Sequence, residues 1–275
     1  MKPKKSTGKI VVLIISIIFS LLFLMPIIWS IAASFQIEGS KKILAVDWFI
    51  PPYTISNYMK VLSNSSVSTW LRNSFVIAVI TLAATILFSS LAAYAIAKIP
   101  FKGKNLITLF FLIGLMVPGE ATIVPLFITA NGLNLIDTYA GMILPSIAGS
   151  MNLIIMRSFF EGIPDDILEA ARIDGAGTIR IFSKIVLPMS QNILVTISIF
   201  AFLGSWNNYL WPLLCAMSES MFTIPIGIPT FAGTYTVDYI IPVTASMIAS
   251  IPAIILFLIF EKYIVEGVAT SGIKG

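Results

Sequence analysis

Six long apolar runs dominate this sequence and leave only one broad class of fold open to it. Of its 275 residues, 57% are hydrophobic and only 11% are charged, whereas soluble domains carry about 25% charged residues. Each run offers the roughly 20 apolar residues that a helix needs to cross a bilayer. Because hydrocarbon supplies no water, the backbone of such a run must form its hydrogen bonds internally. We therefore predict an all-α integral membrane protein.

The polar segments between the runs divide the chain. We expect a tail over residues 1–9, a transmembrane domain over residues 10–264 and a second tail over residues 265–275. The first run is too long for a signal-peptide core, so we expect it to be retained. Residues 36–69 are predicted to carry short amphipathic helices on the membrane surface. The six predicted spans cover residues 10–35, 70–97, 105–129, 139–160, 189–214 and 242–264.

Two features of these spans bear on function and orientation. Pro and Gly residues inside spans three, four and six predict breaks in backbone hydrogen bonding, which favours a translocating core over a passive anchor. Trp48, Trp70 and Trp211 fall near one predicted boundary, as an aromatic belt would. Basic residues gather on one side of the predicted topology, which the positive-inside rule assigns to the cytoplasm. We therefore expect both termini to be cytoplasmic. These basic residues are 13 of the 17 in the chain: Lys2, Lys4, Lys5, Lys9, Lys98, Lys102, Lys104, Arg157, Arg172, Arg180, Lys184, Lys262 and Lys274.

A polar island over residues 161–188 separates spans four and five on that cytoplasmic side. Pro164 can open a helix, and Gly175 suits the left-handed position that ends one. We expect a second short helix from about Thr178 to Val186 that stops before Pro188. The island is thus predicted to form a helix–turn–helix outside the bilayer.

The island contains Glu169-Ala170-Ala171, then three residues and Gly175, then nine residues and Ile185-x-Leu187-Pro188. In this spacing it resembles the EAA loop of ABC importer permeases, whose pattern is EAA, three residues, Gly, nine residues and I-x-L-P. This resemblance implies a type I ABC importer transmembrane fold in which the loop docks on an ATP-hydrolysing subunit. Every position of the pattern is filled here. The residues implied in coupling to the ATPase are Glu169, Ala170, Ala171, Asp174, Gly175, Ile185, Leu187 and Pro188.

Three other stretches narrow the resemblance: FLGSWNNYLWPL over residues 202–213, Asn57-Tyr58, and Arg72-Asn73-Ser74. They resemble stretches of carbohydrate importer permeases of the maltose type. The resemblance implies a permease subunit in a prokaryotic plasma membrane that imports an oligosaccharide. It further implies a second, different permease, an ABC ATPase dimer that binds ATP and Mg, and an extracellular sugar-binding protein. We expect this chain to bind no cofactor and to be non-catalytic, because it lacks a phosphate-cradling Gly-Lys-Ser/Thr loop.

Polar residues inside the spans are the candidates for contact with substrate. Glu120 lies at a Pro-Gly break in span three, where ionisable groups are costly and usually functional; related permeases often have Gln near this point. Packing and interface anchoring are the alternative roles for the remaining candidates. Those candidates are Asn152, Trp206, Asn207, Asn208 and Tyr209.

Composition excludes several other functions. One cysteine, Cys215, and no histidine exclude an internal disulfide and make a His/Cys metal site or a His-dependent triad implausible. The net charge of +4 follows from topology, so we expect no nucleic-acid partner. Two other transporter classes stay open. One is an ABC permease for a non-sugar such as glycerol phosphate, and the other is an ion-coupled secondary transporter, which would need buried charged relays in several spans.

Overall fold

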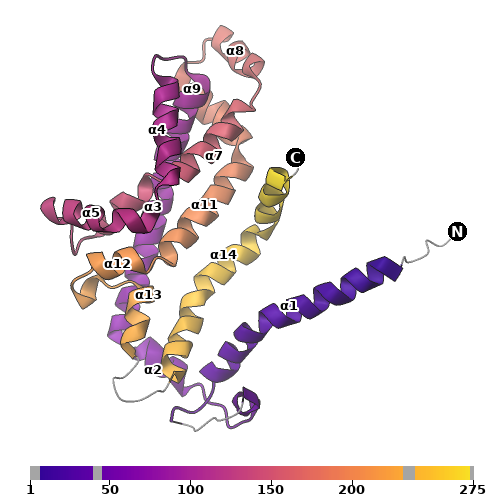
Figure 1. Cartoon of the computed structure of the whole chain (residues 1–275), viewed down its shortest axis with the longest axis vertical. Helices are drawn as coiled ribbons and strands as arrows, with labels where there is room; N and C mark the ends of the chain where they lie inside the picture. Colours follow the sequence, from indigo (N-terminus) through magenta and orange to yellow (C-terminus); the bar gives the residue numbers. More distant parts are fainter. Residues whose placement is uncertain (1–6, 40–44, 232–238, 273–275) are drawn as a thin grey trace. The chain divides into compact units, whose positions relative to one another are not determined.

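The computed structural model describes residues 7–39, 45–231 and 239–272, and these residues form helices and loops. Most of the predicted basic tail, and the side chains of the predicted C-terminal tail, lie outside the described residues. Three described helices are each long and apolar enough to cross a bilayer, and three bent helix pairs qualify as further candidates (Figure 1). The three helices are α1 (Thr7–Ser34), α3 (Ser65–Lys98) and α14 (Ile240–Gly272). They overlap the first, second and sixth predicted spans. However, α3 begins at Ser65 rather than at residue 70, and α14 continues to Gly272, through most of the segment predicted as a C-terminal tail.

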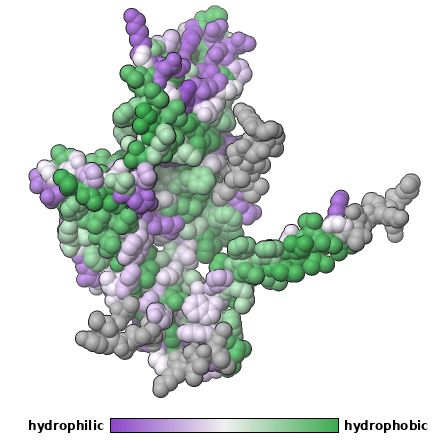
Figure 2. Space-filling model, viewed as in Figure 1, coloured by the Kyte–Doolittle hydropathy of each residue, from purple (hydrophilic) through white to green (hydrophobic). Residues whose placement is uncertain are grey.

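The chain divides into two compact units, and unit 1 comprises residues 1–67 and 228–251. It contains α1, η1 (Ala45–Phe49), α2 (Ser56–Ser63), η4 (Ile228–Phe231) and the first part of α14. The apolar side chains of α1 are exposed along most of its length (Figure 2). A helix that is apolar all round is a membrane span or is covered by another protein.

A cluster of hydrogen-bonded polar groups holds unit 1 together at the end of α1. The Asn57 amide donates to the carbonyls of Ser34 at 2.9 Å and Gln36 at 2.7 Å. Tyr58 and Ser34 share a hydrogen bond between their hydroxyls at 2.7 Å. The Thr244 hydroxyl also donates to the Ser34 carbonyl, at 3.2 Å, and so ties α14 to α1. The motif residues Asn57 and Tyr58 therefore close the end of the first span.

Unit 2 comprises residues 68–227 and 252–275 and contains most of α3. Its other elements follow in chain order. They are α4 (Lys104–Met116), α5 (Gly119–Gly132), α6 (Tyr139–Ile147), α7 (Ser150–Glu161), α8 (Asp165–Ile173), α9 (Thr178–Ile181), η2 (Phe182–Val186), α10 (Leu187–Met189), α11 (Gln191–Trp206), α12 (Leu210–Cys215), η3 (Glu219–Met221) and α13 (Ile224–Gly227).

Breaks divide the regions predicted as spans three, four and five. α4 and α5 meet at 105°, because Val117 before Pro118 adopts an extended conformation that ends α4. α6 and α7 meet at 42°, at Ala148 and Gly149. Span five was predicted as one helix up to Leu214, but α11 ends at Trp206 and α12 follows as a separate helix. In contrast, Pro252 interrupts neither α14 nor its predicted span.

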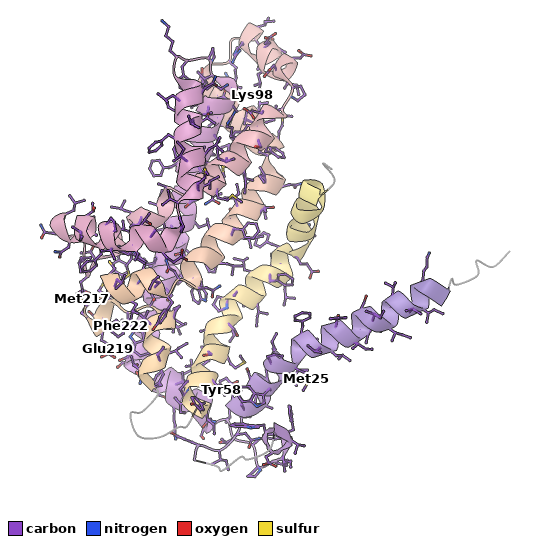
Figure 3. All side chains as sticks on the ribbon, in the orientation of Figure 1. Met25, Tyr58, Lys98, Met217, Glu219 and Phe222 are labelled. Carbon is purple, nitrogen blue, oxygen red and sulfur yellow. The ribbon has the colours of Figure 1, made fainter. Side chains whose placement is uncertain are left out.

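The first turns of α3 are fixed to the loop over residues 216–224. The Asn73 amide donates to the carbonyls of Ser220 at 2.8 Å and Phe222 at 2.9 Å, and it accepts from the Tyr139 hydroxyl at 2.5 Å. The Ser74 hydroxyl accepts from the Ile224 N–H at 2.8 Å. Figure 3 labels Glu219 and Phe222 of this loop. The motif Arg72-Asn73-Ser74 thus contributes two buried structural residues.

The aromatic belt prediction is wrong for two of its three tryptophans. Trp70 is 2% exposed and its ring lies against Gly227, where an added Cβ would come within 2.2 Å. Trp211 is 5% exposed and donates to the Gly141 carbonyl at 2.9 Å. Both rings pack inside unit 2, so they cannot anchor at the lipid interface.

Asp137 joins two connecting segments of unit 2. We expect Asp137→Ala to destabilise the protein by about 1–3 kcal/mol, because the groups that bind its carboxylate would lose their acceptor. Its carboxylate accepts from the N–H groups of Met217 and Ser218, at 2.9 and 3.0 Å, and from the Ser218 hydroxyl at 3.0 Å. Its φ of 60° suits Asp or Asn. Asp137→Asn should therefore lose less stability than Asp137→Ala. Thermal unfolding in detergent at pH 7 is the measurement, and equal midpoints for the alanine variant and the wild type would contradict it.

This site also predicts a pH dependence. Hydrogen bonds from the Ser218 backbone, above all, hold the pKa of Asp137 below its usual value. A lowered pKa gives stability that is present above the unfolded pKa, near 3.9, and is lost as pH falls through the folded pKa. The difference in stability between the wild type and Asp137→Asn should therefore shrink below about pH 4.

Candidate functional site

The predicted helix–turn–helix forms as a hairpin over residues 165–189. Its first helix, α8, begins directly after Pro164, with Asp165 and Asp166 at its positive end. Gly175 has a φ of 82°. The Gly175 N–H donates to Arg172 and the Ala176 N–H to Ala171, at 3.0 and 2.9 Å. These two bonds form a Schellman motif, so the left-handed glycine predicted from sequence is confirmed.

The second half of the hairpin differs from the prediction. The helix does not stop before Pro188, because α9 passes through a π-helical turn, η2, into α10 at Leu187–Met189. Pro188 has no N–H to offer a carbonyl four residues earlier, and a π turn shifts the bonding by one residue. The chain then turns by 81° into α11 at Ser190. Ser190 is fully buried and donates to the Val186 carbonyl at 2.6 Å.

One side of the hairpin is packed into unit 2. Leu168, Ile181 and Val186 are at most 2% exposed and share a core with the ends of α3 and α7 and the start of α11. The motif residues Ala171, Ile185 and Leu187 are partly buried against the same core. The I-x-L part of the motif is therefore a packing element.

Lys98, the last residue of α3, anchors the segment that leads into the hairpin. Its ammonium donates to the Ile163 carbonyl at 2.6 Å and to the Asp165 carboxylate at 2.7 Å, and its side chain is 5% exposed (Figure 3). The hydrogen bond from Lys98 holds the pKa of Asp165 below its usual value. From the sequence, Lys98 was counted only among the basic residues that indicate the topology. Its place at the end of a span, with a Pro-Asp helix start on the same predicted side, could have indicated the anchoring role.

The other side of the hairpin is exposed. Glu169, Ala170 and Asp174 are exposed, and the Glu169 carboxylate has no partner among the described residues. Two apolar side chains stand out beside them, Ile173 at 86% and Ile179 at 82% exposure. Gly175 and Pro188 are also exposed. Hydrophilic residues otherwise gather at this end of unit 2 (Figure 2). The exposed side therefore combines small, acidic and apolar groups that nothing in the described chain covers.

The predicted path residues do not form one group. Glu120 lies in the first turn of α5, just beyond the break, and is exposed. Trp206 is 4% exposed and stacks on Phe202 with ring centroids 5.6 Å apart, so it is a packing residue. Asn207 and Tyr209 are exposed in the break after α11. The Asn208 side chain accepts from the Trp211 N–H at 3.4 Å.

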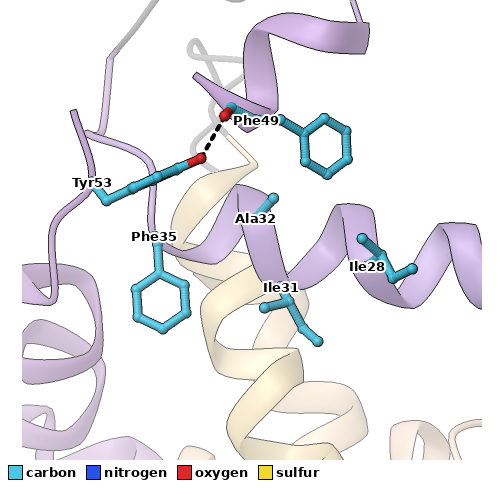
Figure 4. A pocket seen from close by; sticks show the side chains of 6 residues that line it. All are labelled: Ile28, Ile31, Ala32, Phe35, Phe49 and Tyr53. Carbon is cyan, nitrogen blue, oxygen red and sulfur yellow. Dashed lines mark hydrogen bonds between the residues drawn. The ribbon is translucent and has the colours of Figure 1, made fainter. Parts of the chain in front are cut away.

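Each unit contains a cavity among its described residues. The cavity in unit 2 includes Asn152 and has polar walls. The cavity in unit 1, about 380 Å³, is lined by Ile28, Ile31, Ala32, Phe35, Phe49 and Tyr53 (Figure 4). The Tyr53 hydroxyl donates to the Phe49 carbonyl at 2.6 Å. Since this hydroxyl is already paired, the unit 1 cavity offers only apolar surface to a ligand. Among the described residues, no three His, Cys, Asp or Glu side chains group as metal ligands would.

We expect Lys98→Met to loosen the entry to the hairpin. The variant keeps the length of the side chain and removes the bonds to Ile163 and Asp165. Breaking a buried charged contact is costly because the partner groups lose a strong donor. Limited proteolysis should then cut residues 161–178 at least several-fold faster. Lys102→Met is the matched control, since Lys102 is exposed and unpaired within the described structure. Equal cleavage rates in both variants would refute the anchoring role.

Comparison with known proteins gives a consistent family. Residues 85–270 match the family described as binding-protein-dependent transport system inner membrane component. The arabinooligosaccharides transport system permease protein AraQ of Bacillus subtilis (strain 168) is 36% identical, over 99% of this chain and 98% of that protein. The sn-glycerol-3-phosphate transport system permease protein UgpE of Yersinia pestis bv. Antiqua (strain Antiqua) is 34% identical, over 94% and 95%.

The fold has a close solved counterpart. A chain in the crystal structure of a bacterial ABC transporter involved in the import of the acidic polysaccharide alginate matches with a TM-score of 0.84. It is 23% identical, and the match covers 95% of this chain and 99% of that chain. This likeness confirms the predicted all-helical fold of an ABC importer permease. With the family match over residues 85–270, it follows that this chain belongs to the inner membrane components of binding-protein-dependent transport systems.

Proposed function

We propose that this chain is the permease subunit of an ATP-driven carbohydrate importer and that its hairpin couples it to the ATPase. The observation that carries the proposal is the two-sided hairpin. One side is fixed in the core of unit 2, and the other exposes Glu169, Ala170, Ile173 and Ile179. Small residues permit close approach, and exposed apolar side chains next to a charge are typical of a docking surface.

The proposed assembly has three further protein components. A second, different permease completes the translocation path, and a dimer of ABC ATPases binds ATP and Mg and receives the hairpins. An extracellular binding protein delivers the substrate. Membership of a binding-protein-dependent family supports this last partner. The exposed apolar surface of α1 supports a membrane partner or lipid around it.

An oligosaccharide is the substrate we propose. AraQ, which is 36% identical, is named for arabinooligosaccharides, whereas UgpE, at 34%, is named for sn-glycerol-3-phosphate. Sequence identity to these two relatives is therefore too similar to decide between the two classes of substrate. A phosphate ester calls for Arg or Lys at its binding site. The polar cavity of unit 2 is lined by uncharged residues, which favours a neutral sugar over a phosphate.

We propose a prokaryotic plasma membrane location with both termini and the hairpin in the cytoplasm. The supporting observation is the charge distribution, with 13 of 17 basic residues assigned to that side. Figure 3 labels Lys98 near the hairpin end of α3, while Glu219 lies beside the other end.

Charge reversal on the exposed side tests the coupling role. Glu169→Lys should lower ATP-dependent sugar uptake by about tenfold or more, because hot-spot residues at an interface each contribute roughly 2 kcal/mol or more. Uptake into proteoliposomes and co-purification of the ATPase are the measurements. Gly175→Pro should have the same effect, since proline cannot adopt the φ of 82°.

Lys102→Glu is the control, because it changes the charge by the same amount at an exposed position outside the hairpin. It should leave uptake near the wild-type rate. Normal uptake and normal ATPase recovery with Glu169→Lys would overturn the coupling assignment. Uptake driven by an ion gradient without ATP would point instead to a secondary transporter.

Orientation is tested by cysteine labelling in intact cells. Cys215 is the chain's one cysteine and is buried, so Cys215→Ala gives a background without thiols. In that background, Glu219→Cys should react with a membrane-impermeant maleimide from outside. Lys102→Cys should react only after permeabilisation. The opposite pattern would reverse the proposed topology.

A further inference from the structure

The second half of the hairpin holds one residue more than a regular helix of the same rotation would. α9, η2 and α10 follow one another without a gap from Thr178 to Met189, and η2 is a π-helical turn (Figure 1). At its end the Leu187 N–H donates to the carbonyl of Phe182, five residues earlier, whereas an α-helix bonds four residues back. The π turn therefore accommodates one surplus residue inside an otherwise α-helical segment.

The burial of the side chains fits poorly on an unbroken α-helix. Successive residues of an α-helix turn by about 100°, so residues seven positions apart differ in direction by only about 20°. Ile179 and Val186 are seven positions apart, yet Ile179 is 82% exposed and Val186 is fully buried. On one regular helix these two side chains would share a face.

The π turn places the two side chains on different faces. Because η2 holds the surplus residue, Val186 and the residues after it are set back by up to about 100°. Val186 then lies on the same face as Ile181 and Phe182, which are 1% and 7% exposed and belong to the same core. Ile179 is left on the outward face. The π turn thus separates a packed face from an exposed face within this short segment.

Buried hydrogen bonds hold this register at the end of the π turn. The Ser190 N–H donates to the Leu187 carbonyl at 3.1 Å, so it does not pair with the Val186 carbonyl four residues back. The Ser190 hydroxyl donates to the Val186 carbonyl instead, at 2.6 Å, and Ser190 is fully buried. Pro188 has no N–H to restore regular helical bonding. The surplus residue is therefore held in place by the residues that follow it.

We infer that the surplus residue of η2 is a positioning element for docking of the ATPase. It turns Ile179 to the exposed side of the hairpin, where Ile179 joins Ile173 as a second apolar contact for the ATPase. Both side chains are more than 80% exposed, and a partner protein that covers them gains apolar burial. The inference rests on the proposed function, because it assumes that the hairpin receives the ATPase.

Changing the number of residues in η2 by one in each direction tests the inference. After deletion of Ser183, Val186 follows Ile179 by six positions, which leaves the two side chains about 120° apart on a regular α-helix. Co-purification of the ATPase should then stay above half the wild-type recovery. One alanine inserted after Ser183 adds a second surplus residue and turns Ile179 by about 100°. Recovery of the ATPase should fall about tenfold or more, as for the loss of an interface anchor.

Thermal stability distinguishes positioning from a merely structural role. The deletion variant should unfold at a lower temperature than the wild type, because Pro188 would then interrupt a regular turn. The positioning role predicts that this less stable variant still recovers the ATPase. Ser183→Ala is the matched control, since it keeps the residue count and Ser183 is exposed. Equal recovery from the deletion and insertion variants, whether high or low, would overturn the inference.

Cysteine labelling tests the Ile179 contact without any change of length. In the Cys215→Ala background, Ile179→Cys should react with maleimide several-fold more slowly in the assembled importer than in membranes stripped of the ATPase. Lys102→Cys is the control, because it is exposed outside the hairpin and should react equally in both. Equal rates for Ile179→Cys in both preparations would also overturn the inference.

Failure of the proposed function would look different. If Glu169→Lys leaves recovery of the ATPase normal, the hairpin is not the docking element and the coupling role itself fails. If Glu169→Lys loses the ATPase while the deletion and insertion variants behave alike, the coupling role stands and only the positioning role of η2 is overturned.

Discussion

Unit 2 depends on α3 and on the constraint that a helix in hydrocarbon cannot leave backbone groups unpaired. The 34 residues of α3 form one uninterrupted helix, so their backbone groups pair within the helix. The side chains of α3 are then available to bind neighbouring elements. At its first turns, Asn73 and Ser74 hold the loop that follows α12. At its last residue, Lys98 holds the start of the hairpin. α3 is thus bound at one end to the loop over residues 216–224 and at the other end to the start of the hairpin.

The breaks fall at residues that begin or end a helix. Pro118, Gly149 and Asn207 each cap or end a helix at a change of direction. Irregular backbone at such depth is tolerated where it packs on protein or lines a polar cavity. Gly204 and Ser205 lie directly before the break at Asn207, and both line the polar cavity. The breaks and the cavity are therefore parts of one arrangement.

The sequence predicted the helical class, the hairpin and its left-handed glycine from hydropathy and local turn chemistry. Those features depend on residues close together in the chain, such as Pro164 and Gly175. The positions of Trp70 and Trp211 depend on contacts far along the chain, with Glu219 and Gly141. A boundary rule for tryptophan could not anticipate them.

The cavity of unit 2 was equally out of reach from sequence, because its lining residues come from α3, α6, α7 and α11, which only the fold brings together. Asn152 was recognised because an amide inside a span is conspicuous by itself. Lys98 was underestimated because its partners, Ile163 and Asp165, lie over sixty residues away.

The 81° turn at Ser190 gives the hairpin a mechanical property. The helix through α9 and α10 meets α11 almost at a right angle, so a push along the first axis acts across the second. α11 has 16 residues and is therefore about 24 Å long. A rotation of about 5° at Ser190 would displace its far end by about 2 Å. That end carries Gly204 and Ser205. A rotation of the hairpin about Ser190 would therefore move these two residues of the cavity wall.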